Sequence, residues 1–149
     1  MSVRYAHTNI ITADWKRLST FYETVFGCVP VPPVRNQRGA WLSRGTGVPD
    51  AALEGVHLRL PGHGPDGPTL EIFQYVEVRD MPPAPANQRG IGHLAFQVSP
   101  LETYLERALQ HGASPVGKIT EHRVEGVGLL RFIYIADPDG NLIELQTWS

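Results

Sequence analysis

The feature that most constrains this chain is a turn followed by a short strand near its C-terminus. The turn, Asp137–Asn141, favours chain reversal because proline presets φ, and glycine or asparagine accepts a positive φ. In the strand that follows, Ile143 and Leu145 lie on one face and Glu144 lies on the other. A carboxylate in the middle of a short apolar strand is costly to bury without a partner. Glu144 therefore predicts a partner elsewhere in the chain.

Three other strand-like segments carry an ionisable side chain in the same way. They are residues 5–11 with His7, residues 70–73 with Glu71 and residues 91–96 with His93. Imidazole and carboxylate groups are common ligands of divalent metals in proteins. The two histidines and two glutamates therefore predict a metal-dependent enzyme.

Bulk composition excludes several classes of protein. A formal net charge of −2 over 149 residues gives no electrostatic case for binding nucleic acid. Cys28 is the only cysteine, which excludes an intrachain disulfide and a thiolate metal cluster. No apolar run is long enough to span a bilayer, and because a strand is expected to begin close to Met1, we expect no signal peptide. We expect a cytoplasmic protein that does not bind membranes.

The first half of the chain predicts one helix among several strands. Apolar residues between Asp14 and Phe26 fall on one helical face, with Asp14 as the N-cap and Gly27 ending the helix. Proline is depleted from central strands, so residues 28–34 are an edge strand at best. The remaining strands are expected at residues 5–11, 40–44, 56–60 and 69–76.

The second half repeats this order. A strand at residues 91–98 leads into a helix at residues 99–111, which begins with the capping box Ser99-Pro100-Leu101-Glu102. Further strands are expected at residues 114–120 and 129–136, before the strand that carries Glu144. The sequence thus predicts a single α+β domain of two βαβββ half-repeats, at about 1–80 and 89–149, joined by a proline-rich linker at about 81–88. Each half has a histidine in its first strand and a glutamate in its last.

This pattern resembles the vicinal oxygen chelate superfamily, which includes glyoxalase I, methylmalonyl-CoA epimerase, extradiol dioxygenases, and fosfomycin- and bleomycin-resistance proteins. The resemblance rests on His7 followed by Asp14, Phe21-Tyr22 and Gly27; on Leu70-Glu71-Ile72; on Gly92-His93-Leu94-Ala95-Phe96; and on Asp137–Asn141 with Ile143-Glu144-Leu145. It implies that the two modules form an open, cup-shaped mixed β-barrel around one divalent metal, often in a homodimer. The implied metal ligands are His7, Glu71, His93 and Glu144.

Within the superfamily, this ligand set is most similar to that of bacterial glyoxalase I, and methylmalonyl-CoA epimerase is also similar. Bacterial glyoxalase I contacts glutathione through an arginine and an asparagine where this chain has Ile11 and Tyr75. The resemblance therefore implies a reaction class rather than glutathione as substrate. These ligand types bind Ni, Co, Zn, Mn and Fe, so they do not predict which metal is bound.

The expected reaction is that of a lyase or isomerase, in which a proton is abstracted next to a metal-bound carbonyl of a small substrate. Glu144 is preferred over Glu71 as the base. Phe73, Tyr75 and Trp41 are candidate walls of an apolar pocket, and Arg44 is a candidate contact for an anionic substrate. The other histidines, at 57, 63, 111 and 122, lack such a partner pattern, and loops or helix ends account for most of them.

Two alternatives remain open from the sequence. One is an Fe(II)-dependent dioxygenase of the same fold, because a His-His-Glu subset would suffice for that chemistry. The other is a protein that binds without metal, either an antibiotic-sequestering module or an interaction domain with a vestigial site.

Overall fold

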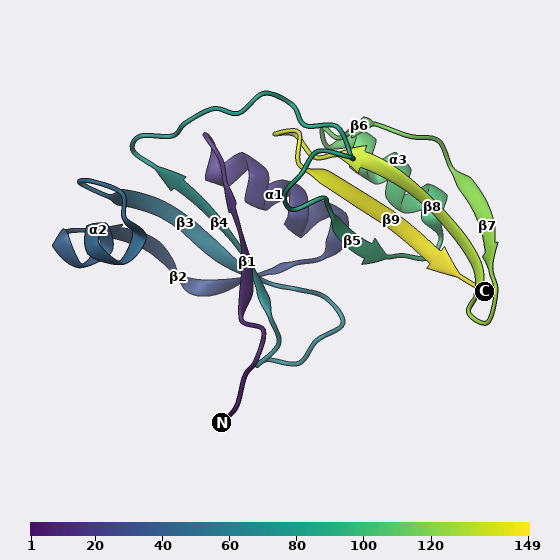
Figure 1. Cartoon of the computed structure of the whole chain (residues 1–149), viewed down its shortest axis with the longest axis horizontal. Coiled ribbons are helices and arrows are strands. Elements are labelled where there is room, and N and C mark those ends of the chain that lie inside the picture. Colours follow the sequence, from purple (N-terminus) through teal and green to yellow (C-terminus); the bar gives the residue numbers. More distant parts are fainter. The chain divides into compact units, whose positions relative to one another are not determined.

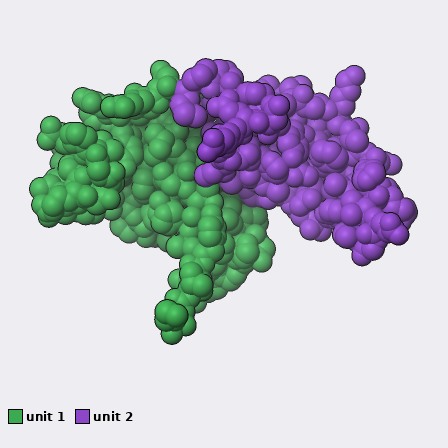
Figure 2. All heavy atoms as spheres, viewed as in Figure 1, with its two compact units in different colours: residues 1–80 green, residues 81–149 purple.

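The computed structural model describes residues 1–149 and contains three helices and nine strands (Figure 1). The chain divides into two compact units, Met1–Asp80 and Met81–Ser149 (Figure 2). Each unit has its own mixed sheet, so the predicted α+β class is confirmed. None of the three helices is long and apolar enough to cross a membrane.

The first unit is built on a four-stranded sheet in the order β1-β4-β3-β2. Strand β1 runs parallel to β4, and the other neighbours are antiparallel. The elements in chain order are β1 (His7–Ile11), α1 (Trp15–Phe26), β2 (Val29–Arg38), α2 (Ala40–Thr46), β3 (Ala52–Arg59) and β4 (Thr69–Tyr75). The proline-rich strand β2 lies at the edge of the sheet, as its composition predicts.

Helix α1 begins and ends where the sequence predicts. The Asp14 carboxylate accepts a hydrogen bond from the backbone N–H of Arg17 at 3.1 Å, and Gly27 ends the helix in the left-handed conformation at φ 70°. The apolar face of the helix is buried and contacts β3 and β4. Burying each large side chain of this face contributes about 1.5–3 kcal/mol.

Strand alternation divides the first sheet into two faces. The buried residues Val56, Leu58, Leu70 and Ile72 lie on the face beneath α1. Glu71 lies between two of them in β4, so its side chain projects to the opposite face. The packing of α1 thereby directs Glu71 away from the helix.

Residues 40–44, predicted as a strand, form helix α2 instead, and this prediction is wrong. Gly39, at φ 113°, precedes the helix, and Gly47 ends it at φ 73°. Only Leu42 of α2 is buried, where it packs with Ala51 and Leu53. A short segment with one buried residue carries too little periodicity to distinguish a helix from a strand.

The second unit has a five-stranded sheet in the order β5-β9-β8-β6, with β7 also paired to β8. Strand β5 runs parallel to β9, and its helix α3 contacts β9 and β6. The elements are β5 (Leu94–Gln97), α3 (Leu101–Gln110), β6 (Ser114–Pro115), β7 (Thr120–Val124), β8 (Gly128–Ala136) and β9 (Leu142–Trp148). The order β5-β9-β8 repeats β1-β4-β3 of the first unit.

Two local predictions for the second unit are wrong. The strand expected at residues 114–120 is interrupted between β6 and β7, where the N–H groups of Val116 and Gly117 both donate to the carbonyl of Tyr134, as in a bulge. The expected capping box is not formed, because Pro100 is the N-cap residue of α3 and makes no side-chain cap.

The turn between β8 and β9 is formed by Asp137–Asn141, as predicted. Asp137 is buried, and its Oδ1 accepts hydrogen bonds from the backbone N–H groups of Asp139 and Asn141, both at 2.9 Å. Gly140 takes a positive φ of 92°, which only glycine adopts readily. This turn sets the start of β9 and thereby the position of Glu144.

Candidate metal centre

The two units place their histidine and glutamate in the same register. In the first unit Asn9 is paired with Glu71 across the parallel strands β1 and β4. In the second unit Ala95 is paired with Glu144 across the parallel strands β5 and β9. His7 precedes Asn9 by two residues, and His93 precedes Ala95 by two residues. The two units therefore resemble each other in the register of these histidines and glutamates as well as in the order of their strands.

In the first unit, the buried carboxylate of Glu71 is the centre of a group of polar contacts. Nδ1 of His7 lies 3.3 Å from Oε1 of Glu71, and Nδ2 of Asn9 donates to Oε2 at 3.4 Å. The side chain is nearly enclosed, since Glu71 is only 7% exposed. Burial raises the pKa of Glu71, while the neighbouring charges of His7 and Arg35 and the Asn9 hydrogen bond act in the opposite direction.

His57 is a further member of this group that the sequence interpretation missed. It lies in β3 directly opposite Glu71, and its Nε2 is 3.0 Å from Oε1. Burial, together with Arg35 and His7, lowers the pKa of His57 to about 4. A signal was present in Val56-His57-Leu58, where an ionisable residue lies between two buried apolar residues, as Glu71 and Glu144 also do.

In the second unit, Nε2 of His93 lies 3.0 Å from Oε2 of Glu144. Tyr134, in β8, is paired with Glu144, and its ring centroid lies 4.7 Å from that of His93. Burial and the nearby Glu144 carboxylate both raise the pKa of the Tyr134 phenol. His93 itself lies immediately before β5 rather than within it, because the strand begins at Leu94.

The predicted substrate-binding residues fall into two groups. Phe73 and Tyr75 follow Glu71 at alternate positions of β4. Both pack against a small cluster that Leu42 of α2 forms with Ala51 and Leu53. The Phe73 ring also lies beside His57, with ring centroids 5.6 Å apart. Trp41 and Arg44 lie on α2, and Trp41 is 55% exposed. Their contact with a substrate stays a prediction.

The histidine–glutamate pairs fit a divalent ion in donor type and spacing. Two ligand atoms about 2.1 Å from one ion, at right angles, lie about 3 Å apart. The His93–Glu144 and His7–Glu71 separations, 3.0 and 3.3 Å, are close to that value. No group of three or more His, Cys, Asp or Glu side chains is arranged to hold a metal. Each pair thus supplies two donors, and the joining of both pairs on one ion stays a prediction.

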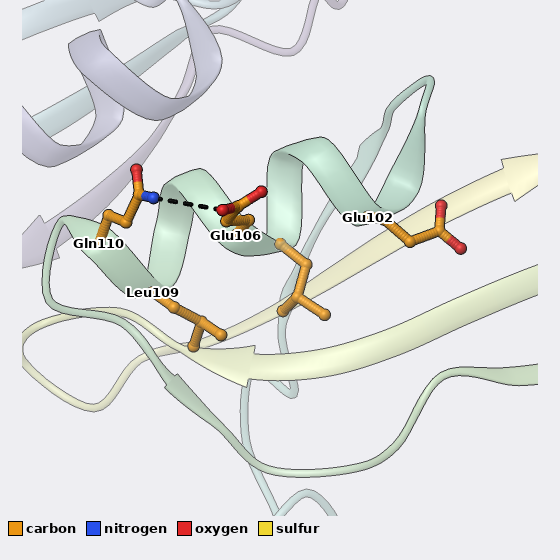
Figure 3. A pocket seen from close by; sticks show the side chains of 5 residues that line it. Glu102, Glu106, Leu109 and Gln110 are labelled. Carbon is orange, nitrogen blue, oxygen red and sulfur yellow. Dashed lines mark hydrogen bonds between the residues drawn. The ribbon is translucent and has the colours of Figure 1, made fainter.

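The surface of α3 has an open hollow that is unrelated to these residues (Figure 3). It is lined by Glu102, Leu105, Glu106, Leu109 and Gln110, and Glu106 accepts a hydrogen bond from Gln110 at 3.4 Å. All five side chains come from one helix, and none belongs to the predicted site. The hollow contains two carboxylates but no histidine, and one of the carboxylates, Glu102, is paired with Arg131 at 2.6 Å.

Comparison with known proteins gives one family and many structures of the same fold. The model of the glyoxalase/bleomycin resistance protein/dioxygenase superfamily matches residues 4–145. A glyoxalase family protein from Bacillus cereus is 22% identical, with a TM-score of 0.84 over 99% of this chain and 95% of that chain. A domain of the same superfamily from Frankia sp. is 16% identical, with a TM-score of 0.64 over the whole of both chains.

A fosfomycin resistance protein from Mesorhizobium loti is 20% identical, with a TM-score of 0.57 over 100% of this chain and 94% of that chain. No curated protein matches the chain. The structural matches confirm the vicinal oxygen chelate fold predicted from the sequence.

Proposed function

The chain belongs to the glyoxalase/bleomycin resistance protein/dioxygenase superfamily, and from this premise we propose that it is a divalent-metal-dependent lyase or isomerase acting on a small molecule. Members of the superfamily commonly bind a divalent metal and small-molecule substrates, but some are resistance or binding proteins. The observation that supports an enzyme is the repeated histidine–glutamate pair, in the same register and at similar spacing in both units.

His7, Glu71, His93 and Glu144 would hold the ion. A bound divalent ion would act as a Lewis acid on a substrate carbonyl and would stabilise the negative charge that develops on its oxygen. Ni, Co, Zn, Mn and Fe all accept imidazole and carboxylate ligands, so the donor set does not select one of them.

Glu144 is the proposed base that takes a proton from the carbon next to the carbonyl. Glu71 is contacted by three side chains, from His7, Asn9 and His57, and these contacts restrict its carboxylate. Glu144 is contacted by His93, and its side chain is 14% exposed. A proton-transferring carboxylate must reach the substrate, which favours the less restricted of the two glutamates.

Phe73 and Tyr75 would form the apolar side of the substrate site. Their alternate positions after Glu71 place them on the face of β4 that carries the carboxylate. Leu42 of helix α2 belongs to the cluster against which Phe73 and Tyr75 pack, so Trp41 and Arg44 of that helix would form the outer edge of the site. Superfamily members often form dimers, and we extend that arrangement to this chain as a homodimer.

The proposed reaction can be tested without knowing the substrate, through exchange of carbon-bound hydrogen. Metal-loaded protein would be incubated in D2O with a panel of small 2-oxo and 2-hydroxy carbonyl compounds, and NMR would follow the loss of the signal of the hydrogen next to the carbonyl. We expect exchange with at least one compound and its loss in Glu144→Gln. The matched control is Glu125→Gln, the same substitution at an exposed glutamate in the turn between β7 and β8.

Two other results would contradict the proposal. Consumption of oxygen with Fe(II), without exchange, would favour the dioxygenase alternative. Tight binding of a small molecule by metal-free protein, without exchange under any metal, would favour the binding-protein alternative.

A further inference from the structure

His57 is held in one place by its strand and by its neighbours. Its Cα is paired with that of Glu71 in the antiparallel ladder of β3 and β4, and it lies between the buried residues Val56 and Leu58. The Phe73 ring lies beside the imidazole, which is 22% exposed. The ring therefore has little freedom to move away from the carboxylate that it faces.

A buried carboxylate requires polar partners, because leaving it without them costs several kcal/mol. For Glu71, the partners of Oε1 are the imidazoles of His7 and His57, and the partner of Oε2 is Asn9. Each partner comes from a strand hydrogen-bonded to β4, either β1 or β3. A side chain supported from rigid strands on both sides is well suited to hold a ligand in a fixed position.

The second unit has a different residue at the equivalent position. Tyr134 in β8 is paired with Glu144 just as His57 in β3 is paired with Glu71. Its ring lies against His93, the histidine of the pair, whereas His57 presents a ring nitrogen to the glutamate. The half-repeats therefore support their histidines and glutamates differently, and the difference is located at these two positions.

We propose that His57 is a positioning residue for Glu71: its imidazole fixes the carboxylate as a stationary metal ligand and leaves Glu144 as the group that moves a proton. The inference rests on the proposed function. His57 is not assigned as a ligand, because the second unit has Tyr134 at the equivalent position and so repeats only the pair formed by His7 and Glu71.

The test compares two replacements of His57. Glutamine can place an amide N–H near the position of Nε2, whereas leucine keeps comparable bulk without a donor. Full-length metal-free protein would be titrated with Co²⁺, and visible absorption would report both the affinity and the ligand field. We expect His57→Leu to weaken Co²⁺ binding by about 10- to 100-fold, as for other residues that orient a metal ligand, and His57→Gln to restore most of the affinity with a wild-type spectrum.

Two outcomes of this titration would overturn the inference. If His57→Leu binds Co²⁺ with wild-type affinity and a wild-type spectrum, Glu71 does not need the His57 imidazole in order to bind the metal. Equal loss in His57→Gln and His57→Leu, with a changed spectrum in both, would make His57 a metal ligand rather than a positioning residue.

A second measurement separates this inference from the proposed function. In metal-free protein, the ¹⁵N chemical shift of the His57 Nε2 atom should change in Glu71→Gln, while that of the exposed His122 should not. No change at His57 overturns the inference whether or not Co²⁺ binds. A change at His57 in a protein that binds no divalent ion supports the positioning of the Glu71 carboxylate by His57, and overturns the proposed function together with the ligand role of Glu71 that rests on it.

Discussion

Glu71 and Glu144 occupy equivalent positions in the two units, each in the last strand and each opposite the residue two positions beyond a histidine. Their surroundings differ, because Glu71 faces His57 across the ladder and Glu144 faces Tyr134. A repeated backbone thus carries two carboxylates with different partners. This difference is the basis for assigning one as a fixed ligand and the other as a base.

The first prediction concerns the core beneath α1. Leu58 is fully buried, and Leu58→Ala should lower the free energy of unfolding by about 2–5 kcal/mol, because it removes buried methyl groups and leaves a cavity. Urea denaturation followed by circular dichroism would measure it. Val76→Ala, at a position that is 80% exposed, should change the stability by less than about 0.5 kcal/mol. Equal effects of the two substitutions would contradict the assigned core.

The second prediction concerns the turn before β9. Asp137→Ala removes the acceptor of the Asp139 and Asn141 backbone N–H groups, and should cost about 1–3 kcal/mol of unfolding free energy. Asp137→Asn keeps a carbonyl oxygen at the Oδ1 position and should be the milder change. Thermal melting of the two variants would compare them, and the account fails here if Asp137→Ala melts at or above the temperature of Asp137→Asn.

The third prediction concerns Cys28, whose thiol is buried. Burial, with a smaller effect of Glu23, raises its pKa from 9.0 to about 12. The unfolded thiol ionises near pH 9 and the folded thiol does not, so stability should fall as the pH rises from 9 toward 12. Cys28→Ala should reduce that slope.

Thiol labelling gives a second measurement of the same burial. At pH 8 a thiol-reactive reagent should label native protein slowly and urea-unfolded protein quickly. Rapid labelling of the native protein would mean that Cys28 is accessible.

The fourth prediction concerns metal removal. A ligand that binds only the folded state at 100 times its Kd stabilises that state by about 2.7 kcal/mol. EDTA should therefore lower the melting temperature of metal-loaded wild type, and the effect should be absent from His93→Ala, which lacks one donor of the second pair. Equal sensitivity of wild type and variant to EDTA would place the bound ion elsewhere.

Much of the fold follows from local signals in the sequence. Helix α1 has a capping aspartate, a full apolar face and a terminating glycine, and all three signals indicate the same helix. The final turn has several residues that favour reversal, and it is also where predicted. Helix α2 has a single buried residue and no side-chain cap, so local pattern could not identify it. Its position depends on tertiary packing with Ala51 and Leu53.

The candidate site shows the same division. The sequence indicates His7, Glu71, His93 and Glu144 as candidates because the half-repeats supply a matching partner for each of them. His57 has tyrosine at its equivalent position in the second unit, so a search for matching ionisable residues passes over it. Its role depends on the pairing of β3 with β4, which the sequence does not specify.

The most direct test of the central claim is the metal content of purified protein reconstituted separately with Ni²⁺, Co²⁺, Zn²⁺, Mn²⁺ and Fe²⁺. We predict about one ion per chain in wild type for at least one of these metals. His7→Ala, from the first unit, and Glu144→Ala, from the second, should each lose it, whereas the exposed His122→Ala should retain it. Wild-type protein that binds none of the five metals, or a loss confined to the variants of one unit, would contradict a single centre built from both pairs.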